Sequence, residues 1–450
     1  MRHFLNSALS LEGQRDFPEH ILSLEEEQDV LVEATQDQAV INSELQEVDR
    51  MGDMSDALED MAVVADNIAG EATPTEDALV TIASNMAVAG TDVDASEIVP
   101  AMESHGGKRR YSAESIRERA KAIWEAIRKI LKEIWKKIEA FFYKIFGTIP
   151  TLRKRIKELQ KKVDDNSSRT IEHKKITIST GVSSLSANYK TPSTDAELRS
   201  NFTQLLGVAK DIYGDSIDAG IKMGETVLDA LNDFDPEKAE DSLKTFLVKM
   251  SGQIKGHKGV KGGSKVNGNR FGEHVDAELS APLLGNISIV EKVPTYVKHT
   301  PGNAPVLGMM ENIRSYSMEV VQTAEKPKDV PASFEMSTAS NASMSAMLDD
   351  AEEMLDILEK FQRGKRATDM KSLRGKLETA SDKATTAMNK AANKDEKEEQ
   401  KAVPYYRALL NFNTAYARWM KDPALPMVSH SLSSIRGVVK VVEKSLAAYK

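Results

Sequence analysis

The chain has 450 residues, of which 40% are hydrophobic, 29% charged and 6% aromatic, so it is long enough for two or three domains with a sizeable core. It contains no cysteine, which excludes disulfide frameworks, thiolate metal sites and cysteine nucleophiles. No uninterrupted apolar run approaches the roughly 20 residues needed to span a bilayer.

The net charge of −9 hides a sharp division along the chain. Residues 1–103 contain 24 acidic and 3 basic residues, a net charge of −21, and the rest of the chain carries +12. No basic residue lies between Arg50 and Lys108. This asymmetry indicates an acidic N-terminal segment followed by a basic body, and it says more about partners than the average charge does.

The acidic segment has helical character. Ser55–Gly70 and Thr75–Gly90 resemble two copies of one unit, each with a Ser or Thr cap, early acidic residues and a closing glycine. Leu24–Val48 also has helical apolar spacing. We therefore expect three small acidic helices that dock on a partner. The alternative is a partly disordered acidic tail on a soluble protein.

Two tripeptides with a small first residue and a final glutamate lie at the charge step. The first is Ala101-Met102-Glu103, followed by Ser104 and a flexible His-Gly-Gly stretch of the kind that gives proteases access. The second is Ser112-Ala113-Glu114, followed by Ser115.

The acidic segment and these tripeptides resemble the internal head, or inner body, proteins of phiKZ-like giant tailed bacteriophages. The resemblance covers the N-terminal layout and the general character of the body, in which no motif is matched residue by residue. It implies an acidic propeptide that the prohead protease removes after a small-x-Glu motif. The bond cut would be Glu103–Ser104, with Glu114–Ser115 as a secondary site.

The same resemblance implies a location and partners. We expect a virion structural protein inside the capsid, assembled in the host cytoplasm. Its expected partners are the prohead protease, other internal head or capsid proteins and non-specific double-stranded DNA. The motif also occurs at Ser10-Leu11-Glu12, Ser23-Leu24-Glu25, Ala95-Ser96-Glu97, Ser317-Met318-Glu319 and Ser333-Phe334-Glu335. The last two lie in the body and must be folded away if this interpretation holds.

Ser112–Phe146 is predicted to be one long basic helix, because its apolar residues recur every three or four positions. Such a helix, with Trp124 and Trp135, either packs against partner helices or lies at a membrane surface. After Pro150, Thr151–Val163 is a second basic helical stretch, interpreted as a coiled-coil segment or a nucleic-acid-facing surface.

The middle of the chain mixes helical and β-type patterns. The expected elements are a short β stretch at Lys175–Ser179, helices at Glu197–Leu231, Pro236–Met250 and Asn312–Ala324, β-type runs at Ile287–Val290 and Thr295–Lys298, and a linker at Glu325–Ser340. We expect the β-type runs to form a hairpin or small sheet.

Ser251–Arg270 is a Gly-rich basic loop without acidic residues. It lacks the GxxxxGK pattern of a P-loop, so we do not expect nucleotide binding. Its lysines can contact nucleic-acid backbone without reading sequence, although a solvated loop is the alternative. The candidate nucleic-acid contacts are Lys108, Arg109, Arg110, Lys255, Lys258, Lys261, Lys265 and Arg270.

The last quarter is predicted to be an antiparallel helical bundle. Its four helices are expected at Ala342–Gln362, Asp369–Ala392, Pro404–Met420 and Val428–Tyr449. The methionine and aromatic stripes of these helices are interpreted as core.

The sequence thus predicts a mainly α protein in four parts. These are an acidic propeptide (1–103), a basic amphipathic helical segment (104–165), a mixed, mostly helical domain with a small β hairpin (166–325), and a C-terminal helical bundle (341–450). We expect no enzyme activity, no catalytic or metal-binding residues and no cofactor. Two other hypotheses stay open: a membrane-active helical protein activated by removal of the acidic segment, and a cytoplasmic helical scaffold with an acidic tail.

Overall fold

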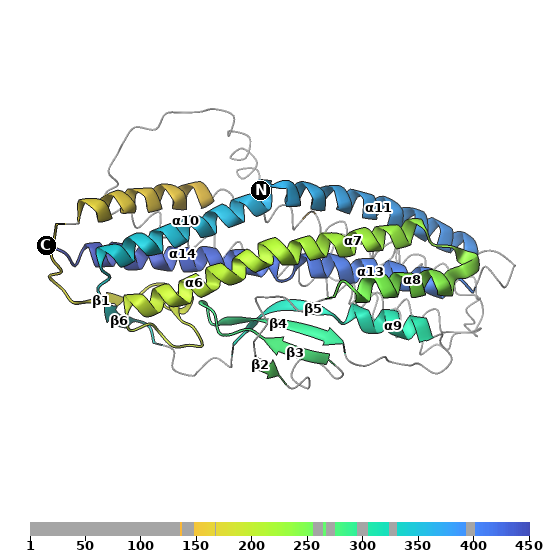
Figure 1. Cartoon of the computed structure of the whole chain (residues 1–450), viewed down its shortest axis with the longest axis horizontal. Helices are drawn as coiled ribbons and strands as arrows, with labels where there is room; N and C mark the ends of the chain where they lie inside the picture. The colour runs from red at the N-terminus through yellow and green to blue at the C-terminus, as the bar shows by residue number, and fades with distance from the viewer. Residues whose placement is uncertain are drawn as a thin grey trace, which may run out of the picture. The chain divides into compact units, whose positions relative to one another are not determined.

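The computed structural model describes residues 136, 148–166, 168–254, 264–266, 275–294, 305–323, 331–392 and 401–450. Helices make up 69% of this part of the chain, which confirms the prediction of a mainly α protein (Figure 1). The predicted acidic helices and, apart from the helical Lys136, the predicted helix Ser112–Phe146 lie outside the described residues.

The first described helix of some length spans residues 148–165 and is the unlabelled yellow helix of Figure 1. It is followed by β1 (Lys175–Ile178), the short η1 (Ser183–Leu185), and then α6 (Asp195–Asp211) and α7 (Ile217–Asn232). A π-helical turn, η2 (Ile212–Ser216), joins α6 to α7, so the two continue one another without a loop. The helix starts at Asp195 because the Thr194 hydroxyl accepts a hydrogen bond from the Glu197 amide.

The remaining elements alternate between helix and sheet up to residue 337 and are helical thereafter. They are η3 (Pro236–Lys238), α8 (Ala239–Ser251), β2 (Ser264–Val266), β3 (Val275–Leu279), β4 (Ile287–Pro294), α9 (Pro305–Arg314), β5 (Ser317–Gln322), β6 (Phe334–Ser337), α10 (Asn341–Arg363), α11 (Lys365–Ala392), α13 (Val403–Lys421) and α14 (Ala424–Leu446). All four helices predicted for the last quarter are present.

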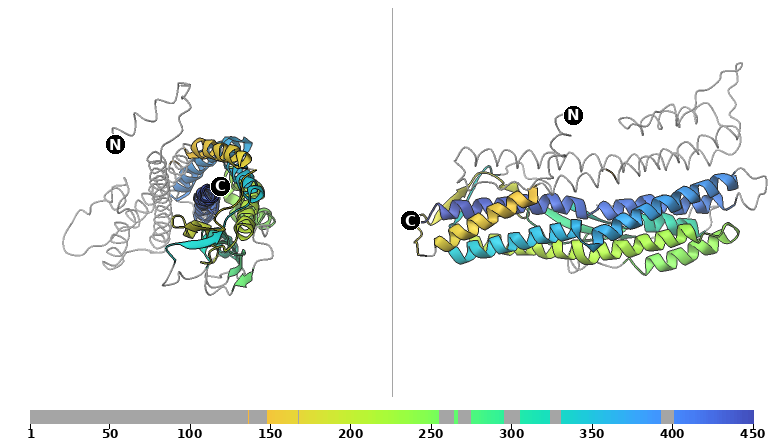
Figure 2. Two further views of the ribbon diagram at one scale, coloured as in Figure 1. Left: turned by 90° about the vertical axis from the view of Figure 1, so that its left-hand side faces the viewer. Right: turned by 90° about the horizontal axis from the view of Figure 1, so that it is seen from above.

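The long helices pack in two neighbouring groups (Figures 1 and 2). Helix α10 contacts α6 and α14, whereas α11 contacts α7 and α13. Helices α10 and α11 are separated only at Gly364, where a side chain would collide with the Lys360 carbonyl. Arg366 at the start of α11 donates two hydrogen bonds of 2.7 Å to the Asp218 carboxylate on α7. Helices on both sides of residue 341 therefore share one hydrophobic core.

Aromatic side chains fill the centre of the group around α7, α8 and α13. The ring of Phe412 on α13 meets Phe246 of α8 and Trp419 edge-to-face, with centroid distances of 4.9 and 5.2 Å. Trp419 in turn meets Tyr316 at 5.3 Å. Edge-to-face pairs of this kind add to the stabilisation that burial alone provides.

Two antiparallel sheets complete the described part of the chain. The larger has the strand order β2-β3-β4-β5, and the smaller pairs β1 with β6. The expected run Ile287–Val290 lies in β4, whereas Thr295–Lys298 lies outside the described residues, and the β element is larger than the expected hairpin. The prediction of a helix through Asn312–Ala324 is wrong, because α9 ends at Arg314 and β5 follows. The predicted linker at Glu325–Ser340 contains β6. Both strands depend on partners distant in sequence.

The C-terminal residues are bonded to the segment that follows helix 148–165. Thr170 and Lys450 exchange two backbone hydrogen bonds, and the amide of Glu172 donates to the Ala448 carbonyl at 2.9 Å. The Tyr449 hydroxyl donates to the Ala339 carbonyl just before α10. These bonds fasten helix 148–165, α10 and α14 together at one end.

Candidate nucleic-acid interface

The structure reaches few of the site residues that the sequence suggested. The tripeptides Ala101-Met102-Glu103 and Ser112-Ala113-Glu114, with Ser104 and Ser115, lie outside the described residues, as do Lys108, Arg109 and Arg110. The same holds for Lys255, Lys258, Lys261 and Arg270. Lys265 is described and lies in β2, in register with Glu278 of β3. The structure therefore does not gather the predicted contacts into one site.

The glutamate of each small-x-Glu tripeptide in the described body lies in a strand or a helix. Ser317-Met318-Glu319 opens β5, and Phe334-Glu335 of Ser333-Phe334-Glu335 begins β6. A third match that the sequence analysis missed, Ala351-Glu352-Glu353, lies within α10. Exposed loop tips are the usual places of proteolytic cutting. These tripeptides of the body are therefore not in exposed loop tips.

Glu319 has partners that hold its tripeptide in the sheet. Its carboxylate accepts hydrogen bonds from Lys292 of the neighbouring strand at 2.8 and 3.0 Å and from the Ser317 hydroxyl at 2.7 Å. Burial by itself raises the pKa of Glu319, but these bonds outweigh it and lower the pKa below its usual value. The carboxylate therefore stays charged and bonded at neutral pH.

Helix 148–165 is the basic element that the structure describes in full, and it has a regular buried face. Its apolar residues recur at steps of three and four, namely Ile149, Leu152, Ile156, Leu159 and Val163, and all are buried. Ile156 and Leu159 are among the largest fully buried side chains of the protein. The helix is therefore an integral part of the core, as an amphipathic pattern predicts.

The two arginines of this helix flank the buried face and are neutralised within the fold. Arg153 forms ion pairs with three carboxylates of α10, those of Glu352, Asp356 and Glu359, at 3.3, 2.8 and 3.0 Å. Burial opposes the charged form, but the three carboxylates raise the pKa of Arg153.

On the opposite flank, Arg155 binds Glu443 of α14 at 2.8 Å and Glu158 of its own helix at 3.5 Å. The arginines therefore join helix 148–165 to α10 and α14 and are not directed at a nucleic acid.

Three of the four lysines of the same helix lie on the side away from the core, and the fourth, Lys162, is exposed on the flank of Arg155. Lys154, Lys157 and Lys161 are exposed, and their spacing of three and four residues puts them on one face, opposite the buried stripe. Within the described part of the chain, no ion pair involves them. We call this face, defined by Lys154, Lys157 and Lys161, the lysine face. The sequence could have revealed it, because Arg153 and Arg155 fall about 100° to either side of Lys154 on a helical wheel.

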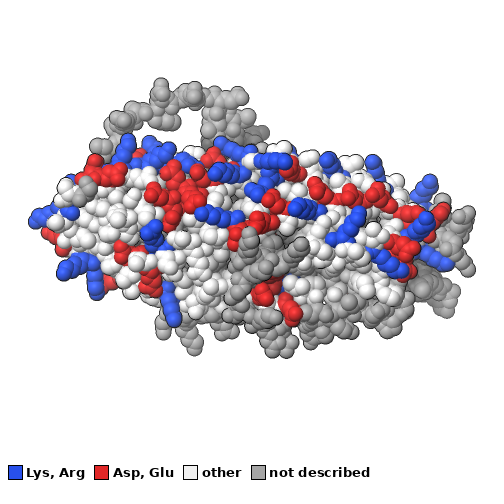
Figure 3. Space-filling model, viewed as in Figure 1, with Lys and Arg blue, Asp and Glu red and all other residues white. Residues whose placement is uncertain are grey.

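Net positive charge is confined to one stretch of the sequence. Residues 104–162 contain 18 basic and 6 acidic residues, a net charge of +12. Residues 163–450 contain 39 of each and are neutral. Figure 3 agrees for the face it displays, where basic and acidic side chains alternate over the helices. The exposed lysines that the structure describes in this cationic stretch are Lys136, Lys162 and the three of the lysine face.

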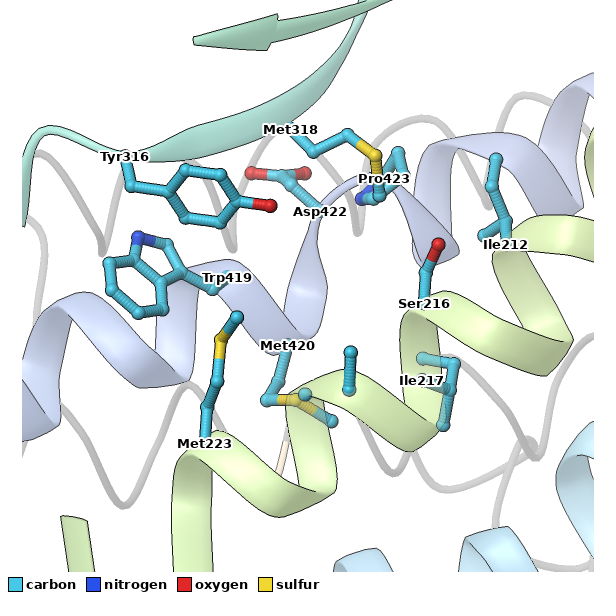
Figure 4. A pocket seen from close by; sticks show the side chains of 12 residues that line it. Ile212, Ser216, Ile217, Met223, Tyr316, Met318, Trp419, Met420, Asp422 and Pro423 are labelled. Atoms are coloured by element: carbon cyan, nitrogen blue, oxygen red, sulfur yellow. The ribbon is translucent and has the colours of Figure 1, made fainter. Parts of the chain in front are cut away.

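A small pocket lies where α7 and the π-helical turn meet β5 and the connection between α13 and α14 (Figure 4). Its walls are mostly apolar, and three methionines contribute to them: Met223, Met318 and Met420. The Tyr316 hydroxyl donates a 3.2 Å hydrogen bond to the buried Glu291, and Asp422 at the rim pairs with Lys421 at 3.3 Å. Tyr316 and Asp422 thus have partners outside the lining of the pocket.

Neither metal-binding clusters nor spanning helices occur in the residues that the structure describes. No group of three or more His, Asp or Glu side chains there is placed to hold a metal ion. No helix there has the length and apolarity needed to cross a bilayer.

These features define a helical structural protein with a neutral folded body and a cationic stretch before it. The family model for phiKZ-like phage internal head proteins matches residues 18–444, so the chain belongs to this family. It is accordingly a phage structural protein located inside the virion capsid. Neither a curated protein nor a solved structure matches the chain.

Proposed function

We propose that the chain is packaged in the phage head with an acidic propeptide, residues 1–103, which the prohead protease removes after Glu103. The remaining chain then lies against the packaged DNA as a non-enzymatic internal head protein. The observation that carries this proposal is the charge step, because the cationic stretch begins directly after the candidate cleavage site.

Cleavage acts as an electrostatic switch in this proposal. The precursor carries −9, whereas the chain from Ser104 onward carries +12. All of that net charge lies in residues 104–162, and the neutral remainder forms the sheets and most of the core. Cationic side chains release counterions from DNA phosphates, so binding depends on charge and not on base sequence.

The fold supports selective processing. The described body offers its small-x-Glu tripeptides only within strands and a helix. A precursor that folds in the host cytoplasm and assembles with other internal head or capsid proteins would therefore keep these tripeptides of the body from the protease.

Intact mass measurement and N-terminal sequencing of the chain from purified virions test the proposal. We expect the mature chain to begin at Ser104, or at Ser115 if the secondary site is also used. A virion chain that still begins at Met1 contradicts the proposal. A chain cut after Glu319 or Glu335 contradicts the protective role of the strands.

A membrane-active protein is the second candidate function. The observation in its favour is the apolar spacing of Ser112–Phe146, with Trp124 and Trp135 on a basic amphipathic helix. Leakage of anionic liposomes caused by the processed chain, and abolished by Trp124→Glu with Trp135→Glu, would favour this function. Retention of DNA without leakage would favour the first.

A further inference from the structure

We propose that the lysine face of helix 148–165 contacts the phosphate backbone of packaged duplex DNA. The inference rests on the proposed function and names a surface for it. The contacting residues are Lys154, Lys157 and Lys161, none of which was among the candidate contacts taken from the sequence.

The spacing of the lysine face fits a DNA strand. Seven residues separate Lys154 from Lys161, which corresponds to a rise of about 10 Å along an α-helix. Phosphates of one strand follow one another about every 3.4 Å along the duplex axis. Three lysines on one helical face therefore cover the axial length of about three phosphates of one strand.

The charges of this face are available because the fold neutralises their neighbours. Glu158, the nearest acid on the same helix, is turned toward Arg155. Three adjoining carboxylates of α10, those of Glu352, Asp356 and Glu359, are paired with Arg153. Asp349 accepts a 2.8 Å hydrogen bond from Gln160. An approaching phosphate thus meets three ammonium groups beside carboxylates that already have partners.

Acidic residues also set the limit of the face. Asp164 and Asp165 are exposed in the last turn of the helix, beyond Lys161. The attractive part of the surface therefore lies in the turns that precede Asp164. These turns lie next in sequence to residues 104–147, which carry 12 basic and 5 acidic residues.

The choice of side chains fits contact without sequence recognition. Arginine forms rigid paired hydrogen bonds with carboxylates, and both arginines of the helix are used in that way inside the fold. Lysine presents a mobile point charge that pairs with phosphates in many geometries. Phosphate contacts of this kind position a protein on DNA but carry no sequence information.

Lysine acetylation in intact virions, followed by mass spectrometry, tests the inference. The reactivity of the lysine face is compared between full particles and particles that have released their DNA. The matched controls are Lys376, Lys383 and Lys390, which are exposed on one helix, α11. We expect the lysine face to react more slowly in full particles and to regain its reactivity after DNA release, while the control lysines change little.

Three results would overturn the inference. Equal reactivity before and after DNA release excludes contact with DNA. Protection that persists after release assigns the face to a protein neighbour. If the control lysines of α11 are protected as strongly as the lysine face, the protection is not specific to the lysine face. Absence of the chain from particles would instead contradict the proposed function, and the inference with it.

Charge-reversal variants provide the second measurement. Phages that encode Lys154→Glu, Lys157→Glu and Lys161→Glu together are compared with phages that encode Lys376→Glu, Lys383→Glu and Lys390→Glu. Both sets change the same number of charges at exposed positions, so the fold is retained. For chains extracted from particles, we expect the first set to reduce the slope of log affinity for DNA against log salt by about 2.7. A reduction that is equal in both sets overturns the assignment.

Discussion

At the scale of single residues, Arg153 joins helix 148–165 to three carboxylates of α10. Its replacement by Ala leaves Glu352, Asp356 and Glu359 of α10 without their shared cation. Because all four side chains retain some solvent exposure, we expect a loss of about 1–2 kcal/mol in the free energy of unfolding, measured by urea denaturation.

Arg363→Ala is the matched control for this prediction. Arg363 also pairs with Glu359, at 3.2 Å. The Arg363 side chain is 67% exposed and lies on α10, one turn after Glu359. Exposed pairs of this kind contribute about 0.3–0.5 kcal/mol. If both variants lose the same stability, Arg153 does not fasten the helix to α10.

His430 on α14 is the residue that we expect to make stability depend on pH. Its ring lies against the turn before β4, where a Cβ on Gly285 would be 3.0 Å from the imidazole Nδ1. Burial lowers the pKa of His430 to about 4, from an ordinary value of 6.5. The unfolded chain therefore takes up a proton at a higher pH than the folded chain does.

The sign of the effect follows from that difference. The neutral, buried His430 contributes its full stabilisation of the folded state above pH 6.5. This contribution decreases as the pH falls from 6.5 toward 4, and below pH 4 no further stability is lost through this group. Between pH 7 and pH 5 we expect His430 to account for a loss of up to about 2 kcal/mol in the free energy of unfolding. His430→Gln has no such titration, so a variant that loses as much stability as the wild type over this range contradicts the prediction.

At the scale of elements, the close approach of α7 to α13 depends on a glycine. A Cβ at Gly224 would collide with the Tyr416 hydroxyl and lie 2.6 Å from the Leu373 side chain of α11. Because Tyr416 is fully buried, Gly224→Ala has to move α7 away from α13. We expect this substitution to lower the free energy of unfolding by about 1–3 kcal/mol, measured by thermal denaturation.

Gly375→Ala on α11 serves as the control, since nothing lies within 4 Å of its added Cβ. Replacing glycine in an open helical position usually stabilises by about 0.5–1 kcal/mol. Opposite shifts of the two melting temperatures are therefore expected, and equal shifts would show that the contact with Tyr416 is unimportant.

Elements with a local pattern were predictable from the sequence, and elements with distant partners were not. Met344, Met347 and Leu355 of α10 were placed in the core by their helical spacing, and all three are fully buried. By contrast, β5 was predicted to be helical because its pairing with β4 is not encoded in its own residues. The strand β6 was assigned to a linker for the same reason, since it pairs with β1, about 160 residues earlier.

The candidate site divides in the same way. The charge step and the basic helix were visible in the sequence, because both are properties of consecutive residues. The positions of arginines and lysines around the helix follow from their spacing, but the ionic partners of the arginines do not, because they lie on α10 and at Glu443, about 200 and 290 residues away. Long-range partners decide which charges of a basic helix remain available to a ligand.

At the scale of the whole molecule, the proposal predicts opposite behaviour for the precursor and the processed chain on DNA. The full chain is anionic, and its 21 excess negative charges precede the cationic stretch directly. The chain extracted from virions should therefore bind DNA-cellulose at low salt, whereas the precursor should pass through. If six or more phosphates are contacted, affinity should fall at least about 1,000-fold between 50 and 200 mM salt. Elution of both forms at the same salt concentration would mean that the acidic segment does not control DNA binding, and the electrostatic switch would be absent.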